Sequence, residues 1–377
     1  MFTYDYRSAR FDPSEQSIWR FRSLLPIQSR ENEVSLGEGL TPLVLSRLSL
    51  GCRLWLKDEG RNPTGSMKDR ALSVAVSAAR EAGKTRVIIA STGSAGMAAS
   101  AYAARAGMRC LVLVPRPTTR ERLVVMAALG AEVVEVDGTF EDLMEIIGEA
   151  RRHGWEELTT YRKANSYQAE GPKTIAYELT EQMGDVPDAV VVPVGGGGTL
   201  SAIWRGFQDL LEMGRISRVP RMIGVQNVHF NALELALKQG LTTEEQILAL
   251  GLDAGVSVIT RNLKHAFPPD SVEALNALRQ SGGMVVTVTD EEAVKAQVEL
   301  ARTDGLFAEP SSAVTLAAIG KLTTRQELAP EASVVAILSG SGLREVQTAM
   351  DTMHPVIQEE TAEAALQRVK VPSTRLN

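Results

Sequence analysis

The sequence predicts an α/β protein with two units, each built on a mainly parallel, twisted β-sheet flanked by helices. Short apolar runs typical of buried strands alternate with longer runs whose apolar residues recur at helical spacing. This alternation implies parallel strand pairing through right-handed crossovers. Three loops rich in glycine or serine directly follow predicted strands. At 377 residues, the chain is long enough for two domains or one large α/β unit.

A first series of elements begins with a strand at residues 54–58 and a helix at residues 67–83. Its further strands are predicted at 86–91, 110–114 and 132–136, and its helices at 97–106, 118–129 and 140–153. After a polar loop at 164–171, a second series has strands at 189–194, 222–226, 284–288 and 333–338 and helices at 173–183, 200–211, 232–238, 271–280, 291–303 and 313–321. We expect residues 1–35 to form an extended arm or a short helical lead, and residues 359–377 a helix with a loose tail.

Composition argues against several classes of partner. A formal net charge of -6 with 44% hydrophobic residues gives no sign of a nucleic-acid partner or an anionic membrane surface. No apolar run approaches the roughly 20 residues of a membrane span, and the N-terminus lacks a basic head followed by an apolar run. Cys52 and Cys110 each lie in an apolar run, which favours buried free thiols and a cytoplasmic setting. The four histidines show no ligand spacing, so no metal site is expected.

One lysine, Lys68, is predicted at the start of a helix. It lies in the sequence NPTGSMKDR at residues 62–70, where proline and glycine bar regular structure and Ser66 can cap the first helical turn. The positive field at a helix N-terminus disfavours the ammonium form, and a neutral amine can condense with a carbonyl to form a Schiff base. For an isolated lysine, the alternative is a solvated charge on a surface turn.

A run of four glycines is the second candidate site. Gly195, Gly196, Gly197 and Gly198 follow a predicted strand, and Thr199 opens the next helix. Because glycine has no Cβ, successive backbone N–H groups can curl around a phosphate at the helix N-terminus. The spacing matches neither a dinucleotide fingerprint nor a P-loop, which points to a phosphorylated cofactor without a nucleotide. The alternative is a tight strand-to-helix turn.

Two serine-rich loops have a similar setting. Ser91, Thr92, Gly93 and Ser94 offer hydroxyl and N–H groups that suit a carboxylate, although a well-capped helix start would need the same residues. The third loop, residues 339–342, follows the last predicted strand. All three loops lie beyond the carboxyl ends of strands, where α/β sheets bind ligands.

Together these motifs resemble the pyridoxal-phosphate (PLP) enzymes of the tryptophan-synthase-β structural type, also called fold type II. Over about residues 36–345, the resemblance is greatest to the threonine synthases. It rests on the ordered motifs NPTGSMKDR, STGSAG, GGGGT and SGSGL, and on GEGLTPL at 37–43, KDEG at 57–60, AYAARAG at 101–107, EGPKT at 170–174 and EPSSA at 309–313.

The resemblance implies a role for each candidate residue. Lys68 would bind PLP as a Schiff base and carry protons, and residues 195–199 would bind the cofactor phosphate. Ser339 would face the pyridine nitrogen, and Ser94 the pyridine 3-hydroxyl. The substrate would contact Ser91, Thr92, Gly93, Asn165, Ser166 and Gln168. Residues 1–79 and 166–377 would form the large PLP-binding domain and residues 80–165 a small mobile domain, in a homodimer.

The chain departs from the threonine synthase pattern at several of these positions. Gln168 stands where the pattern has an arginine that helps to hold the substrate phosphate, and an amide lacks both the charge and the bidentate geometry of a guanidinium. Arg162 or Lys163 could supply the lost charge. The other changes are Ser94, Gly196 and Thr199 in place of asparagines, and Ser341 in place of a histidine.

The sequence therefore predicts a PLP-dependent carbon–oxygen lyase or synthase acting on an L-amino acid with a leaving group at Cβ or Cγ. Threonine synthase is the nearest activity, converting O-phosphohomoserine and water into threonine and phosphate. An ammonia-lyase or β-replacement enzyme acting on serine or threonine is the alternative, which Gln168 and the four-glycine loop favour. A non-catalytic PLP or amino-acid binding protein is a third interpretation, and the presence of Lys68 argues against it.

Overall fold

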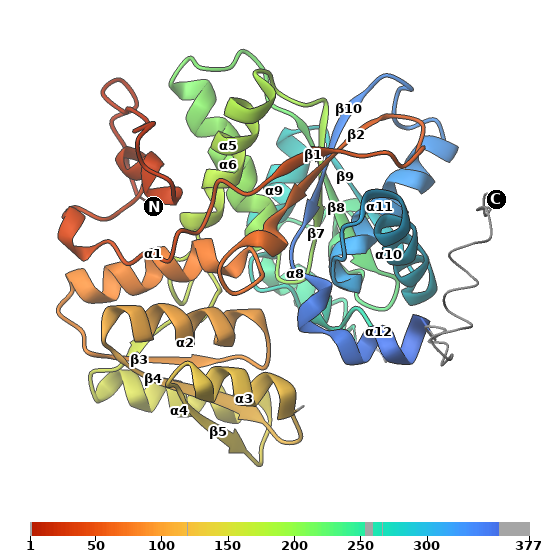
Figure 1. The fold of residues 1–377 in the computed structure, drawn as a ribbon. Helices are drawn as coiled ribbons and strands as arrows, with labels where there is room; N and C mark the ends of the chain where they lie inside the picture. Colours follow the sequence, from red (N-terminus) through yellow and green to blue (C-terminus); the bar gives the residue numbers. More distant parts are fainter. Residues whose placement is uncertain (1, 119, 253–258, 266, 354–377) are drawn as a thin grey trace, which may run out of the picture.

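A computed structural model describes residues 2–118, 120–252, 259–265 and 267–353 of the chain (Figure 1). Its strands form two sheets, and the larger has the order β1-β2-β10-β7-β8-β9. The bounds of these strands are β1 Leu43–Leu45, β2 Arg53–Asp58, β7 Ala189–Pro193, β8 Arg221–Asn227, β9 Met284–Val288 and β10 Ser333–Leu338. Only the β1–β2 pair in this sheet is antiparallel among the described residues.

Helices cover both faces of the larger sheet because its central strands are apolar on both sides. All five residues of β7 are buried. Val190 and Val192 pack with one group of helices, and Val191 with the other. The first group is α5 Thr174–Met183, α6 Gly198–Glu212, α7 Ala232–Lys238 and α9 Ser271–Gln280, and the second is α10 Asp290–Asp304 and α11 Pro310–Thr324.

The smaller sheet is parallel and has the order β5-β4-β3-β6. Its strands are β3 Arg86–Ala90, β4 Arg109–Pro115, β5 Glu132–Val136 and β6 Glu156–Glu157. Helices α1 Lys68–Glu81, α2 Ser94–Ala106 and α3 Arg120–Ala128 pack in one core with it, and α4 Phe140–Arg152 packs in another. Helix α1 thus packs in the core of the smaller unit. The domain boundary predicted from the sequence, after residue 79, places most of this helix in the large domain.

The predicted elements are confirmed in type and order, with small shifts at their ends. Helix α2 begins at Ser94 rather than Met97, so the serine-rich loop abuts its first turn directly. The short helical lead expected within residues 1–35 is present as the 3-10 helices η1 Ile18–Leu24 and η2 Arg30–Asn32. The sequence did not predict β1, β6 or the helices α8 Glu244–Leu248 and α12 Val346–Met353. The predicted helix at 359–377 lies outside the described residues. Cys110 is buried and Cys52 half-buried, and both are free thiols.

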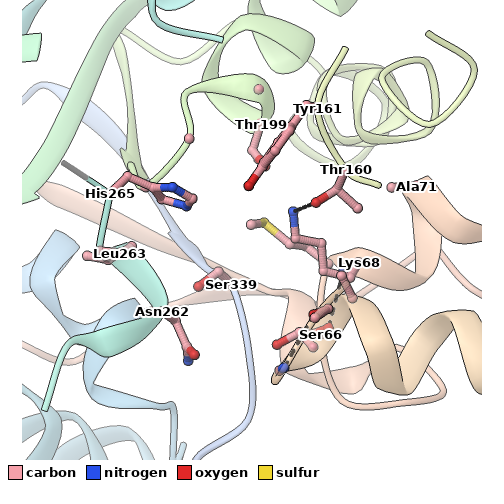
Figure 2. Close-up of a pocket in the computed structure, with 18 of the residues that line it drawn as sticks. Ser66, Lys68, Ala71, Thr160, Tyr161, Thr199, Asn262, Leu263, His265 and Ser339 are labelled. Carbon is pink, nitrogen blue, oxygen red and sulfur yellow. Dashed lines mark hydrogen bonds between the residues drawn. The ribbon is translucent and has the colours of Figure 1, made fainter. Parts of the chain in front are cut away.

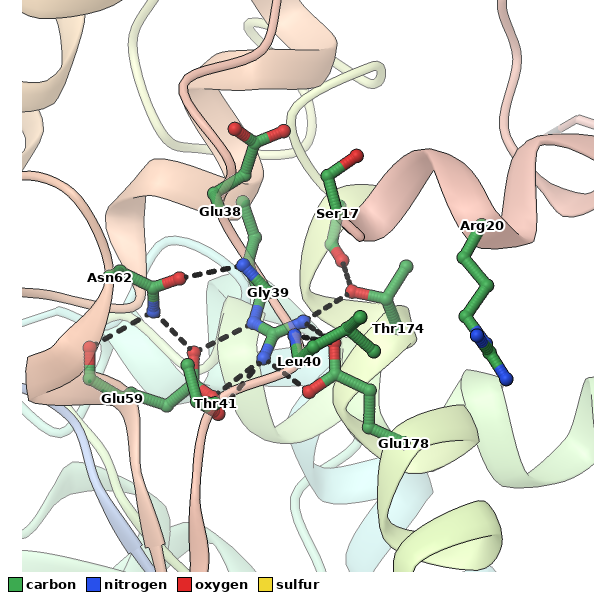
Figure 3. Close-up of polar contacts among 12 residues, drawn as sticks. Ser17, Arg20, Glu38, Gly39, Leu40, Thr41, Glu59, Asn62, Thr174 and Glu178 are labelled. Atoms are coloured by element: carbon green, nitrogen blue, oxygen red, sulfur yellow. Dashed lines mark hydrogen bonds and ion pairs between the residues drawn. The ribbon is translucent and has the colours of Figure 1, made fainter. Parts of the chain in front are cut away.

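A buried ion network holds the start of α1 against the larger sheet. Arg70, in the first turn of α1, has no exposed surface and donates to Glu59 from Nε and Nη2, both at 2.7 Å. The same guanidinium donates to Glu178 of α5, at 2.8 Å from Nη2 (Figure 3). Lys57 of β2 also donates to Glu178, at 2.6 Å. Although burial alone would raise it, Arg70 and Lys57 lower the pKa of Glu178 to about 2.

We expect Arg70→Met to lower the free energy of unfolding by about 3–5 kcal/mol, because it leaves two buried carboxylates without their main partner. Urea unfolding measures this loss. Arg152→Met is the matched control, since Arg152 pairs with Glu149 on the surface, where an ion pair contributes about 0–1 kcal/mol. Equal stability of the two variants would contradict the assignment.

Candidate active site

A cavity of about 710 Å³ lies where the predicted loops meet. Residues from all three loops line it, together with Lys68. The loops follow β3, β7 and β10, whose carboxyl ends therefore face the same space. The lining residues singled out by sequence are Lys68, Ser91, Thr92, Gly93, Ser94, Gln168, Gly195, Gly196, Gly197, Gly198, Thr199 and Ser339.

Lys68 is the first residue of α1, and its side chain reaches into the cavity (Figure 2). Its Nζ donates to the Thr160 hydroxyl at 3.4 Å. Burial lowers the pKa of Lys68, and the negative charge of Asp270 acts in the opposite direction. The backbone N–H of Lys68 donates to Oγ of Ser66 at 3.3 Å, but the N-cap residue of α1 is Met67 rather than Ser66. A buried amine whose pKa is lowered is suited to nucleophilic and proton-transfer chemistry.

The four-glycine loop leads into α6, which begins at Gly198. No backbone N–H of residues 195–198 donates a hydrogen bond to the described part of the chain. Gly197 has φ +93°, and a Cβ there would lie 2.8 Å from the carbonyl oxygen of Asp270. A Cβ on Gly198 would lie 2.5 Å from Oδ2 of the same residue. Glycine is therefore required both by backbone conformation and by close approach.

Asp270 closes the glycine loop from the other side. Its backbone N–H donates to the Gly196 carbonyl at 2.9 Å, and its Oδ1 accepts from the Arg162 backbone N–H at 3.0 Å. Burial raises the pKa of Asp270 to about 6, against the effect of that hydrogen bond. Asp270 thus connects the glycine loop to the backbone at Arg162, and both residues lie far from the loop in the sequence.

Two arginines flank the serine-rich loop. Arg344 donates from Nη2 to Oγ of Ser94 at 3.0 Å, and Arg122 of α3 donates from Nη1 to the Thr92 carbonyl at 3.4 Å. Arg122 also pairs with Glu345, which belongs to the other unit. The loop predicted to receive a substrate carboxylate therefore lies beside two arginines, each with a carboxylate within 4.0 Å.

Ser339, at the end of β10, is held in a buried hydroxyl and carboxyl network. Its Oγ lies 2.9 Å from Oγ of Ser312 and donates to Glu309 Oε1 at 3.3 Å. Burial, reinforced by Glu345, raises the pKa of Glu309 to about 7. Met67 donates its backbone N–H to the Ser339 carbonyl at 2.9 Å, which joins this loop to the lysine loop.

Three residues of the segment 165–168 were predicted to contact the substrate, and only one of them lines the cavity. Gln168 lines it, whereas Ser166 is exposed elsewhere. Asn165 is buried outside the lining and accepts from the backbone N–H of Tyr167 at 3.1 Å and of Gln168 at 3.2 Å. Asn165 thus shapes the turn that presents Gln168.

The cations suggested as replacements for the missing arginine also point elsewhere. Lys163 is exposed and pairs with Glu244, and Arg162 pairs with Glu273 at 3.5 Å. Arg122, Arg261 and Lys264 line the cavity instead. No local pattern marked these three residues, since neither their spacing nor their neighbours form a motif.

His265 and Asp270 also line the cavity, and the sequence did not single them out. Both follow the short turn η5 Arg261–Leu263 and reach the glycine loop only through the tertiary fold. The only signal for His265 was its place among four scattered histidines. Within the described ranges, no three His, Cys, Asp or Glu side chains could hold a metal ion, and no helix is long and apolar enough to cross a bilayer.

Comparison with known proteins agrees with this geometry. Residues 34–340 match the family described as "Pyridoxal-phosphate dependent enzyme". The chain belongs to this family. It is 34% identical to the threonine synthase of Methanocaldococcus jannaschii, over 97% of this chain and 92% of that one. It is also 34% identical to the threonine synthase of Halalkalibacterium halodurans, over 94% of this chain and 98% of that one.

Solved structures confirm the fold. Threonine deaminase isoform 2 from Solanum lycopersicum has a TM-score of 0.69 at 21% identity, over 83% of this chain and 88% of that one. Maize serine racemase has a TM-score of 0.69 at 19% identity, over 88% of this chain and 94% of that one. The fold is that of the tryptophan-synthase-β-like PLP enzymes, as the sequence predicted. The homodimer and the mobility of the smaller unit stay predictions.

PLP is the cofactor of this family, and the cavity fits it. The unbonded N–H groups of residues 195–198 provide donors for a phosphate at the start of α6. Lys68 offers an enclosed amine in the same cavity, and Ser339 a buried hydroxyl. The donor set therefore suits a phosphorylated aldehyde that is bound at both ends.

Borohydride reduction tests the role of Lys68. The wild-type protein loaded with PLP should become covalently labelled at Lys68, as mass spectrometry of peptides would show. Lys68→Ala should take up no label, whereas Lys163→Ala should behave like wild type because Lys163 lies on the surface. Full labelling of Lys68→Ala would contradict the assignment.

The close approach at Gly197 predicts a specific loss of cofactor affinity. Gly197→Ala should weaken PLP binding by about tenfold or more, because the new Cβ must displace the Asp270 backbone. Gly214→Ala is the matched control: Gly214 follows the other end of α6 with φ +67° and has open space at its Cβ position. Titration of PLP into both variants measures the difference, and equal affinities would contradict the prediction.

Proposed function

We propose that this chain catalyses a PLP-dependent reaction of an L-amino acid with a leaving group at Cβ or Cγ, and specifically that it is a threonine synthase. Its reaction would convert O-phosphohomoserine and water into threonine and phosphate. The observation that carries this proposal is the 34% identity to threonine synthases along almost the whole chain. The positively charged side chains around the Lys68 cavity support it, because the substrate carries both a carboxylate and a phosphate.

The residues around the cavity have separate roles in the proposed reaction. Bound PLP supplies an electron sink that stabilises negative charge at the substrate Cα. Lys68 Nζ, whose pKa burial lowers, removes and returns protons at Cα and Cβ. The loop at residues 91–94 receives the substrate carboxylate at the start of α2, where unpaired N–H groups favour an anion. Arg122 adds positive charge beside that loop.

The enclosed geometry also protects the reaction. Residues of both units line the cavity, and the ion pair between Arg122 and Glu345 connects the two units. Exclusion of bulk water strengthens each electrostatic contact inside the site.

A serine or threonine ammonia-lyase is the second candidate, and one observation favours it. Gln168 lines the cavity where the threonine synthase pattern has an arginine, so one expected contact to the substrate phosphate is missing. An unphosphorylated substrate would not need that contact. The remaining cations argue for the first candidate.

A direct assay separates the two activities. Purified protein loaded with PLP should release phosphate from O-phosphohomoserine and form an equal amount of threonine, and Lys68→Ala should do neither. Formation of 2-oxoacid and ammonia from threonine or serine, without phosphate release from O-phosphohomoserine, would establish the ammonia-lyase instead.

A substitution of Arg122 tests whether this residue helps to bind a negatively charged substrate. Arg122→Gln should raise the KM for O-phosphohomoserine by about tenfold, because a charged hydrogen-bond donor beside the carboxylate loop is lost. Arg162→Gln is the control, since the Arg162 side chain pairs with Glu273 instead of lining the cavity. Equal KM values for the two variants, with both folded by circular dichroism, would argue against this role.

A further inference from the structure

The ring of His265 lies against the first half of the glycine loop. A Cβ on Gly195 would lie 3.0 Å from Cδ2 of the ring, and a Cβ on Gly196 would lie 3.9 Å from Nε2. The ring edge that carries Nε2 therefore faces the four-glycine loop, which leads into α6. Figure 2 shows His265 beside the cavity together with Lys68 and Thr199.

His265 has unused hydrogen-bonding capacity at this position. Its ring makes no hydrogen bond to any described residue, although it is enclosed and lines the cavity. A neutral imidazole carries one N–H donor, and the half-buried ring can present it to a ligand in the cavity. Burial, reinforced by the charge of Lys68, lowers the pKa of His265 to about 4, so the ring is neutral near pH 7.

The glycine loop itself offers a phosphate few side-chain donors. Gly195, Gly196, Gly197 and Gly198 have no side chain, and Thr199 supplies a single hydroxyl. The Nε2 edge of His265 lies beside the position that a side chain at residue 196 would enter.

We propose that His265 donates a hydrogen bond to the phosphate group of PLP, in place of the side-chain donor that Gly196 lacks. The phosphate is held between the backbone N–H groups of the loop on one side and the imidazole on the other. The charge of Lys68 acts on the His265 ring, and Asp270 lies against Gly197 and Gly198 on the same loop. The segment after η5 is thus part of the cofactor site.

The experiment compares two ligands on four proteins in the absence of substrate, so it does not depend on the proposed reaction. PLP and pyridoxal, which lacks the phosphate, are titrated into wild type, His265→Ala, His265→Gln and His229→Ala. His229 is exposed and does not line the cavity, so it is the matched control. Phosphorus NMR of the bound cofactor gives a second readout.

His265→Ala should weaken PLP binding by about 10- to 100-fold, the usual effect of losing a hydrogen bond to a charged group. Its affinity for pyridoxal should be unchanged, and the phosphorus signal of bound PLP should shift. His265→Gln retains an N–H donor and should recover part of the PLP affinity. Wild-type PLP affinity in His265→Ala would overturn the proposal, and so would an equal loss for PLP and pyridoxal, which would mean that the ring only supports the local fold.

Discussion

The buried guanidinium of Arg70 is the contact on which the geometry of the site most depends. It lies two residues after Lys68 and bridges Glu59 with Glu178 of α5 (Figure 3). A charged group without exposed surface tolerates almost no displacement, because any shift leaves a carboxylate unpaired. The first turn of α1 is therefore held in one place relative to the larger sheet, and with it the amine of Lys68.

The cavity arises where this fixed turn meets loops from both sheets. Helix α1 starts against the larger sheet and then packs into the core of the smaller one, so it connects the two units. Arg122 with Glu345, and Arg344 with Ser94, add charged and polar contacts between loops of the two units. Such polar contacts between the units differ from the apolar contacts that hold each core together.

Local sequence patterns identified the parts of the site that depend on backbone conformation. The four-glycine loop, the start of α1 and the serine-rich loop each combine turn residues with an adjacent helix, and the cavity contains all three. Asn165 and Ser166 were grouped with Gln168 by their motif, but their side chains face away from the cavity. A motif of neighbouring residues does not reveal which side chain of a turn points inward.

By itself, the sequence determined the fold class, the family and the cofactor, and it singled out a lysine that lines the cavity. These depend on helix and strand periodicity and on glycine positions, which are local properties of the chain. Only the tertiary structure decided which charged side chains line the cavity and what covers the glycine loop. Arg122, His265 and Asp270 reach the cavity from segments far from the loops they contact, and contacts across such separations leave no local pattern.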